Sequence, residues 1–238
     1  PMQVVSGPDY KRTIRFEAPP STRVPREMKR FNAWFNDTAP DRGRAMPALA
    51  RAGIAHLYFV CIHPFEDGNG RIGRAIVDRA LAQDARAPTW LHGLSAELRR
   101  RQEAYYEALN RAQRGNGEVT EWLAWFVAAF AESCRASARL VDEALVRARF
   151  WAEHRDVPLN ERQRKALNRM LDAGPGRFEG GLSQRKYVGL TGASTATAAR
   201  DIKELVQAGL LVPGEGRGRA AHYNLAIPGW EWKRAAGR

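Results

Sequence analysis

The segment 63–74, HPFEDGNGRIGR, brings a base, two carboxylates, glycines and arginines together within twelve residues. Gly68, Asn69 and Gly70 form a turn before a predicted helix, and glycine tolerates backbone conformations in which successive N–H groups converge on an anion. The helix N-terminus adds about half a positive charge at the same point. The turn is therefore predicted to be a phosphate cradle.

The side chains beside the cradle add chemistry to it. Arg71 and Arg74 lie three residues apart, so both guanidinium groups can reach one side of the helix and hold a polyphosphate. Asp67 supplies an oxygen ligand of the kind that Mg²⁺ prefers, and His63, with an ordinary pKa of about 6.5, suits a general base. Phe65 is predicted to point into the core and fix the loop. Together these residues indicate an enzyme that transfers a nucleotidyl group.

Other interpretations of the same segment were weighed. A single His or Asp is usually structural, and Gly-Asn-Gly is usually a plain turn. Residues 68–73 also match the dinucleotide fingerprint G-x-G-x-x-G, after the apolar segment LYFVCI. That fingerprint requires a strand that runs straight into the glycines, whereas HPFED intervenes, and no strand-helix alternation follows. The phosphate site is therefore favoured over a dinucleotide-binding fold.

Length, charge and cysteine content limit the class of protein. A chain of 238 residues can form a domain of about 150 residues and a smaller one. Its formal net charge of +12 favours phosphate-rich or acidic partners, and nucleotide, nucleic acid and acidic protein all stay open. No apolar run approaches the roughly 20 residues of a membrane span, and no secretory signal is present. Cys61 and Cys134 lack the spacing of a disulfide framework or zinc site. These features predict a cytoplasmic protein without a membrane partner, and Pro1 before the first Met suggests a fragment.

Hydrophobic periodicity predicts a mainly α-helical first domain over residues 1–155. A β-hairpin is predicted over residues 2–17, with a turn at Gly7-Pro8-Asp9. Helices are predicted over 24–37, 48–62 and about 71–83, from a start near Ala96, and from Thr120 towards His154.

A second domain is predicted over residues 156–238, after a joint at Asp156-Val157-Pro158. Three short helices, 160–172, 183–189 and 194–208, precede a hairpin over 210–225 with a glycine-rich, basic connection. This domain has 14 lysines and arginines against eight acidic residues. It resembles a winged helix-turn-helix. In that architecture Arg217 and Arg219 would contact phosphates, and the start of the last helix would face a DNA major groove through Ser194, Thr195, Thr197 and Arg200.

The segment 63–74 matches, residue for residue, the signature H-x-F-x-[D/E]-G-N-G-R-x-x-R, and the chain thereby resembles the Fic domain family. The likeness extends to the preceding AHLYFVCIHPF, to FEAPP followed by a Met-bearing helix, and to about residue 155. The family fold is a helical bundle with a β-hairpin flap. The resemblance therefore implies a Fic-type bundle followed by a winged helix.

The resemblance also implies a reaction, the transfer of AMP from ATP to a hydroxyl side chain of a target protein. His63 would take the proton of the hydroxyl, which attacks the α-phosphate of ATP while pyrophosphate leaves. Asp67 would hold Mg²⁺. The remaining site residues implied by the family are the anion hole of Gly68, Asn69 and Gly70, and the arginines Arg71 and Arg74 on the β- and γ-phosphates.

Further features of the family concern the binding of the target protein and of the adenine base. The hairpin over residues 2–17 resembles the flap that adds the backbone of the target as a strand. Tyr105, Tyr106 and Gln113 resemble the adenine-contacting positions, and ordinary packing of the tyrosine pair is the alternative.

The inhibitory pattern of the family, Ser/Thr-x-x-x-Glu-Gly/Asn, is absent from the sequence. Glu179-Gly180 and Glu215-Gly216 are preceded at the required spacing by Pro175 and Leu211. An inhibitory helix is therefore expected upstream of Pro1, or on another chain.

Three functions stay open at this point. The first is a protein adenylyltransferase, and the second is a Fic transferase of another nucleotide or phosphate-containing group. The third is a DNA-binding regulator in which the Fic domain senses nucleotide. A winged helix used for protein docking or homodimer formation is as consistent with the sequence as DNA binding. The sequence does not name the target or its modified residue.

Overall fold

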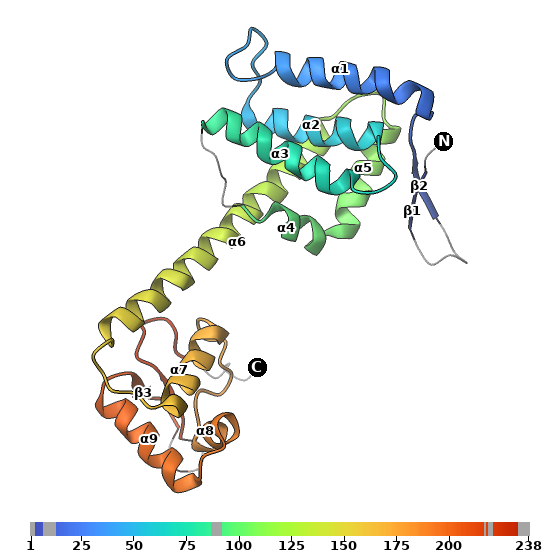
Figure 1. Cartoon of the computed structure of the whole chain (residues 1–238). Coiled ribbons are helices and arrows are strands. Elements are labelled where there is room, and N and C mark those ends of the chain that lie inside the picture. Colours follow the sequence, from blue (N-terminus) through green and yellow to red (C-terminus); the bar gives the residue numbers. More distant parts are fainter. Residues whose placement is uncertain (1–2, 7–12, 87–91, 217, 219–220, 233–238) are drawn as a thin grey trace. The chain divides into compact units, whose positions relative to one another are not determined.

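The computed structural model describes residues 3–6, 13–86, 92–216, 218 and 221–232. These residues are mainly helical, which confirms the predicted fold class at that level (Figure 1). The chain forms two compact units, an N-terminal unit, Pro1–Ala138, and a C-terminal unit, Arg139–Arg238. The predicted domain boundary after residue 155 stays a prediction. Within the described ranges, no helix has the length and apolar content needed to cross a membrane.

The N-terminal unit begins with a two-stranded antiparallel sheet. Strand β1 (Gln3–Ser6) pairs with β2 (Thr13–Glu17), and a register irregularity separates the two ends of the ladder. The two strands confirm the predicted hairpin, whereas the predicted turn at residues 7–9 lies outside the described residues.

The helices predicted for this unit are present, and the structure adds one, over residues 102–114, that was not predicted as a separate element. A short 3₁₀ helix, Ser21–Arg23, precedes the first α-helix. The predicted helices over 24–37 and 48–62 have these bounds in the structure, whereas the third begins two residues earlier than predicted. The helices are α1 (Val24–Asp37), α2 (Ala48–Ile62), α3 (Asn69–Ala85), α4 (Leu94–Arg100), α5 (Gln102–Arg114) and α6 (Thr120–Glu153), which continues into the C-terminal unit.

Helix α2 is the centre of the N-terminal unit. It packs against both α1 and α3, and Figure 1 shows the three helices side by side. Its buried Phe59 lies in an aromatic core with Phe31 of α1 and with Trp122 and Phe126 of α6. Because only six residues, 63–68, separate the end of α2 from the start of α3, the packing of the two helices places the connecting loop at one end of the helix pair.

The C-terminal unit contains α7 (Glu161–Ala173), α8 (Gln184–Thr191) and α9 (Thr195–Gln207). Strands β3 (Leu211–Pro213) and β4 (Tyr223–Leu225) follow as an antiparallel pair, and Leu182 forms an isolated bridge to Tyr223. The three predicted helices and the hairpin are thus confirmed as elements. Phe150 of α6 belongs to the apolar core of this unit.

A buried carboxylate joins the three helices of the C-terminal unit. Asp201 of α9 is 1% exposed and accepts hydrogen bonds from Arg162 Nε (2.9 Å) and the Tyr187 hydroxyl (2.9 Å). Burial raises the pKa of Asp201, but these hydrogen bonds outweigh it and leave the pKa below its usual value. The carboxylate therefore stays charged near neutral pH.

Replacing Asp201 with Asn should destabilise the C-terminal unit by about 2 kcal/mol, because Arg162 loses its charged partner; the partial exposure of Arg162 keeps the loss below that of a fully buried pair. A carboxyl with a lowered folded pKa stabilises above its unfolded pKa of about 3.9 and loses that contribution as the pH falls. The difference from wild type in urea unfolding should therefore be largest near pH 7 and shrink below about pH 4. Asp172→Asn, which alters an exposed acid of α7, is the control. Equal losses in the two variants would contradict the assignment.

Candidate functional site

The loop between α2 and α3 starts with an unusual backbone conformation. His63 has φ +50°, in the left-handed region, and its N–H donates to the carbonyl of Phe59 (3.0 Å). Non-glycine residues rarely adopt this conformation, and it often marks a functional turn. Helix α2 therefore ends at His63, just before Pro64, whose ring disfavours a helical conformation of the preceding residue. The half-buried imidazole lies at this turn.

The side chain of Asn69 closes the loop. Its Oδ1 accepts the N–H of Phe65 (3.1 Å), and its Nδ2 donates to the carbonyl of Phe65 (2.6 Å). Asn69 is 4% exposed, so both bonds are shielded from water. The amide of Asn69 thus holds the loop, which leaves its backbone for the predicted cradle.

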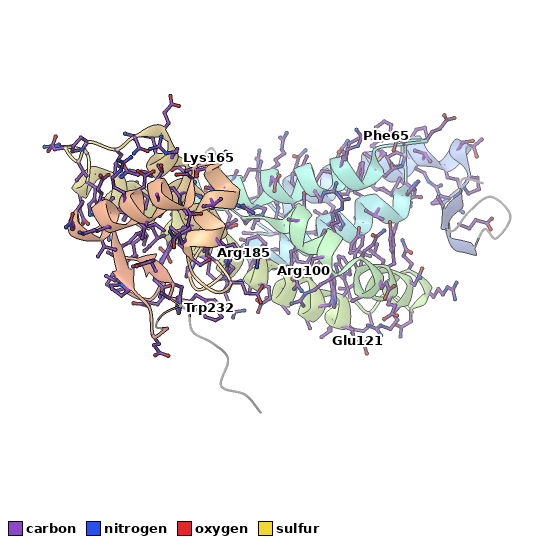
Figure 2. All side chains as sticks on the ribbon, turned by 90° about the horizontal axis from the view of Figure 1, so that it is seen from below. Phe65, Arg100, Glu121, Lys165, Arg185 and Trp232 are labelled. Atoms are coloured by element: carbon purple, nitrogen blue, oxygen red, sulfur yellow. The ribbon has the colours of Figure 1, made fainter. Side chains whose placement is uncertain are left out.

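Phe65 itself is 47% exposed, and Figure 2 shows it at the surface of the N-terminal unit. The prediction that it points into the core is therefore wrong. Its ring touches only the edge of the core, with its centroid 6.4 Å from that of Phe59. The loop is fixed through the backbone of Phe65, by Asn69, rather than by burial of the ring.

The glycine turn provides room for two arginines. Gly68 has φ +88° and caps the N-terminus of α3, which explains why this helix starts at Asn69. The position that a Cβ of Gly68 would take lies 3.6 Å from Arg71 Nη2, and that of Gly70 lies 3.4 Å from Arg74 Nη1. Each guanidinium group therefore lies over one glycine. The structure brings both predicted arginines to the start of α3, where the helix dipole also favours an anion.

Asp67 already contacts two of these donors. Its Oδ1 accepts the N–H of Gly68 (2.6 Å), and its Oδ2 accepts from Arg71 Nη2 (2.8 Å), although its side chain is 90% exposed. In the part of the chain that the structure describes, no group of three or more His, Cys, Asp or Glu residues gathers into a metal site. A cation at Asp67 would therefore share its coordination with ligand oxygens, as Mg²⁺ commonly does with phosphates.

The environment of His63 favours its predicted role as a general base. Burial lowers the pKa of His63 from its usual value of 6.5. The neutral imidazole is therefore the main form near neutral pH, and a neutral imidazole can accept a proton.

A cavity of about 530 Å³ lies beside the last turn of α2, where Cys61 and Ile62 line it; none of its described lining residues belongs to the loop 63–68. The end of β2, the start of α1 and the C-terminal parts of α2 and α5 surround it. Its polar lining comes from Glu17, Arg23, Glu27, Tyr58, Cys61 and Gln113.

The residues predicted to contact the adenine base do not all line this cavity. Among the described residues that line the cavity, Gln113 is present and Tyr106 is not; the ring of Tyr106 packs against that of Tyr105 at 5.3 Å. Burial raises the pKa of Cys61 to about 11, against a hydrogen bond from Gln113, so the thiol stays protonated. Sequence reasoning missed Cys61 and Glu27 as lining residues. Only the position of Cys61 two residues before His63 hinted at it.

The predicted DNA-facing residues of the C-terminal unit also differ in their surroundings. The Ser194 hydroxyl accepts the N–H of Thr197 (3.2 Å) and caps α9, whereas Thr195 and Arg200 are exposed. Arg217 and Arg219 lie outside the described residues.

Comparisons with known proteins point to one family. Residues 4–81 match the model of the Fic/DOC family. This match contains the hairpin, the loop and most of α3, and it ends before Tyr106 and Gln113.

Curated relatives agree with that match at low identity. A "Probable protein adenylyltransferase" of Aquifex aeolicus is 30% identical over 109 residues, which are 46% of this chain and 30% of the relative. A "Protein adenylyltransferase Fic" of Nematostella vectensis is 30% identical over 91 residues (38% and 19%). A protein adenylyltransferase of Caenorhabditis briggsae is 35% identical over 83 residues (35% and 15%). The chain thus matches 30% or less of the length of these relatives.

Among solved structures, a Fic family protein from Desulfovibrio desulfuricans G20 is 21% identical, with a TM-score of 0.46, over 93% of this chain and 58% of that one. The match over residues 4–81 and the curated relatives show that the N-terminal part of this chain contains a Fic/DOC family domain.

Proposed function

We propose that the chain is a protein adenylyltransferase, which transfers AMP from ATP to a hydroxyl side chain of a target protein. The observation that carries this proposal is the arrangement of one short loop. A half-buried histidine of lowered pKa, His63, shares the loop with a glycine turn over which Arg71 and Arg74 lie. The names of the curated relatives support the same reaction.

The proposed reaction is a substitution at the α-phosphate. The neutral imidazole of His63 accepts the hydroxyl proton while the hydroxyl oxygen bonds to the α-phosphorus and the bond to pyrophosphate breaks. Arg71 and Arg74 hold the β- and γ-phosphates, so the leaving charge stays at the helix N-terminus. His63 then releases its proton to solvent. Catalysis would rest mainly on positioning and on charge stabilisation.

The remaining parts of the nucleotide and the target have candidate sites. Asp67 would hold Mg²⁺, which when bound neutralises phosphate charge. The cavity lined by Gln113 has room for a base, and its amide can both donate and accept hydrogen bonds. The paired strands β1 and β2 would take the backbone of the target as a further strand, because an edge strand offers unpaired N–H and C=O groups.

His63→Ala should lower the rate of AMP transfer at least about a hundredfold, because the general base is lost. ATP affinity should change by less than about twofold, because binding rests on the phosphate contacts. Transfer is measured with labelled ATP, Mg²⁺ and a cell lysate, and affinity by calorimetry. Since the pKa of His63 is lowered, wild-type transfer should be constant around pH 7 and fall only below about pH 6.5.

The wild-type protein decides the proposal. If it binds ATP but labels neither itself nor any target, the enzymatic function is contradicted and a nucleotide sensor is favoured. The mass added to a labelled target distinguishes AMP from another phosphate-containing group.

The contacts of Asp67 predict how metal and nucleotide interact. Because Asp67 holds the N–H of Gly68 and the side chain of Arg71, metal-free ATP must displace it. In EDTA, Asp67→Ala should therefore bind ATP about fivefold more tightly than wild type, and the gain that Mg²⁺ brings should shrink. Calorimetry with and without Mg²⁺ measures both quantities.

Glu66→Ala is the matched control, because it removes the same charge from the neighbouring exposed position. Its metal-free ATP affinity should stay within about twofold of wild type, since exposed charges contribute little. An equal gain in both variants would show general repulsion rather than competition by Asp67.

We also propose that the C-terminal unit is a winged helix-turn-helix that binds DNA. The supporting observation is helix α9, whose first half exposes Thr195 and Arg200 while its opposite face is buried through Ala198 and Ile202. A helix presented in this way fits a major groove. The glycine turn before it, at Gly192 with φ +70°, ends α8 sharply.

Arg200→Ala should weaken double-stranded DNA binding about tenfold. It should also reduce the slope of log K against log salt by about one, the amount expected for one lost phosphate contact. Arg99→Ala, an exposed arginine of α4, removes an equal charge and serves as the control. Fluorescence anisotropy at several salt concentrations gives both values. Equal effects of the two variants, or binding that salt does not change, would favour a docking module for protein.

A further inference from the structure

His56 lies inside the N-terminal unit and has no part in the proposed reaction. It is in the middle of α2, is 0% exposed, and stacks nearly parallel to Trp122, with ring centroids 6.0 Å apart. Burial lowers its pKa to about 4, so its ring is neutral near pH 7. A buried polar ring in an aromatic core costs free energy unless its contacts compensate.

The first of these contacts is to α5. His56 Nε2 lies 2.9 Å from the hydroxyl of Tyr105, which is itself buried. Burial raises the pKa of Tyr105, so the hydroxyl keeps its proton. The pair is therefore a neutral hydrogen bond inside the core, and removing either partner would leave a buried polar group unpaired.

The second contact is to α3. A Cβ at Gly73 would lie 3.1 Å from His56 Nδ1 and 3.2 Å from Cε1, so the ring occupies the space of a side chain. Gly73 is thus a point where α3 approaches α2 through its backbone. The ring of His56 sets how closely the two helices pack there.

Both contacts are next to candidate nucleotide residues in the sequence. Arg74 follows Gly73 on α3, and Tyr106 follows Tyr105 on α5, the helix that also carries Gln113. Helix α2 itself ends at the candidate base, His63. Three helices that carry candidate residues therefore meet at one imidazole.

We propose that His56 is a positioning residue, which sets the packing of α3 and α5 against α2. It thereby places Arg74 and the cavity lined by Gln113 so that both can contact the same bound nucleotide. This inference rests on the proposed function, because it assigns His56 to the nucleotide of that reaction. His56 touches no reacting atom. Its effect is therefore expected on ATP affinity, through the neighbours of Gly73 and Tyr105.

Two amides separate the hydrogen bond from simple filling of the core. Gln reaches about as far as Nε2 of histidine, whereas Asn reaches only about as far as Nδ1. His56→Asn should raise the Kd for ATP about five- to tenfold, and His56→Gln should restore most of it. Tyr105→Phe, which removes only the hydroxyl, should raise the Kd by a similar factor. The double variant His56→Asn, Tyr105→Phe should lose little more than either single one, because both remove the same bond.

The affinities are measured by calorimetry with MgATP, and the melting temperature is measured for every variant. Val77→Ala is the control for stability, because it truncates a buried side chain of the same helix α3. It should lower the melting temperature while leaving the Kd within about twofold. A merely structural His56 would make affinity follow melting temperature across all variants, Val77→Ala included.

An unchanged Kd in folded Tyr105→Phe and in His56→Asn would overturn the positioning role. Tyr105→Phe keeps the volume of the core and tests the bond even if the histidine variants do not fold. Wild-type protein that binds no MgATP would contradict the proposed function, and the inference would fall with it. Wild-type protein that binds MgATP without transferring AMP leaves the affinity comparison intact.

Discussion

Two hydrogen bonds between the side chain of Asn69 and the backbone of Phe65 hold the loop on which the site depends. They form across four residues, so the loop closes on the first residue of α3 and does not need a buried side chain of its own. The left-handed turn at His63 starts this loop and the left-handed Gly68 ends it. With both ends and the middle fixed, the backbone that carries His63, the glycine turn and the start of α3 has little freedom. Preorganisation of this kind lowers the entropy cost of binding.

The loop concentrates positive charge, and the protein compensates for it locally. Two guanidinium groups and a helix N-terminus converge on one small region, which without a counter-charge would be repulsive. Asp67 supplies that charge by accepting from the Gly68 N–H and from Arg71. Both acceptor contacts are exposed, so their strength in water is modest and an anionic ligand can replace them. The same carboxylate that stabilises the free loop is thus the group that a metal would take over.

Local signals predicted much of the fold. Helical periodicity gave the bounds of α1 and α2, and the predicted start of the last helix at residue 194 lies one residue before the observed start. The signature also located the loop and its arginines. The signature could not predict features that depend on tertiary structure. Phe65 is apolar, yet its backbone is hydrogen-bonded to Asn69 and its ring is 47% exposed. Cys61 and Glu27, which line the cavity, lie on two different helices, so no local sequence pattern predicts that they line the same cavity.

The two units handle buried polar groups in different ways. Asp201 in the C-terminal unit is a charged group satisfied by several donors, so it joins α7, α8 and α9 through electrostatic attraction. His56 in the N-terminal unit is neutral and makes one hydrogen bond and one close contact to a glycine. A charge there would repel Arg74, whose positive field already lowers the pKa of His56 alongside burial. A neutral ring therefore lets the helices pack closely without adding positive charge near Arg74.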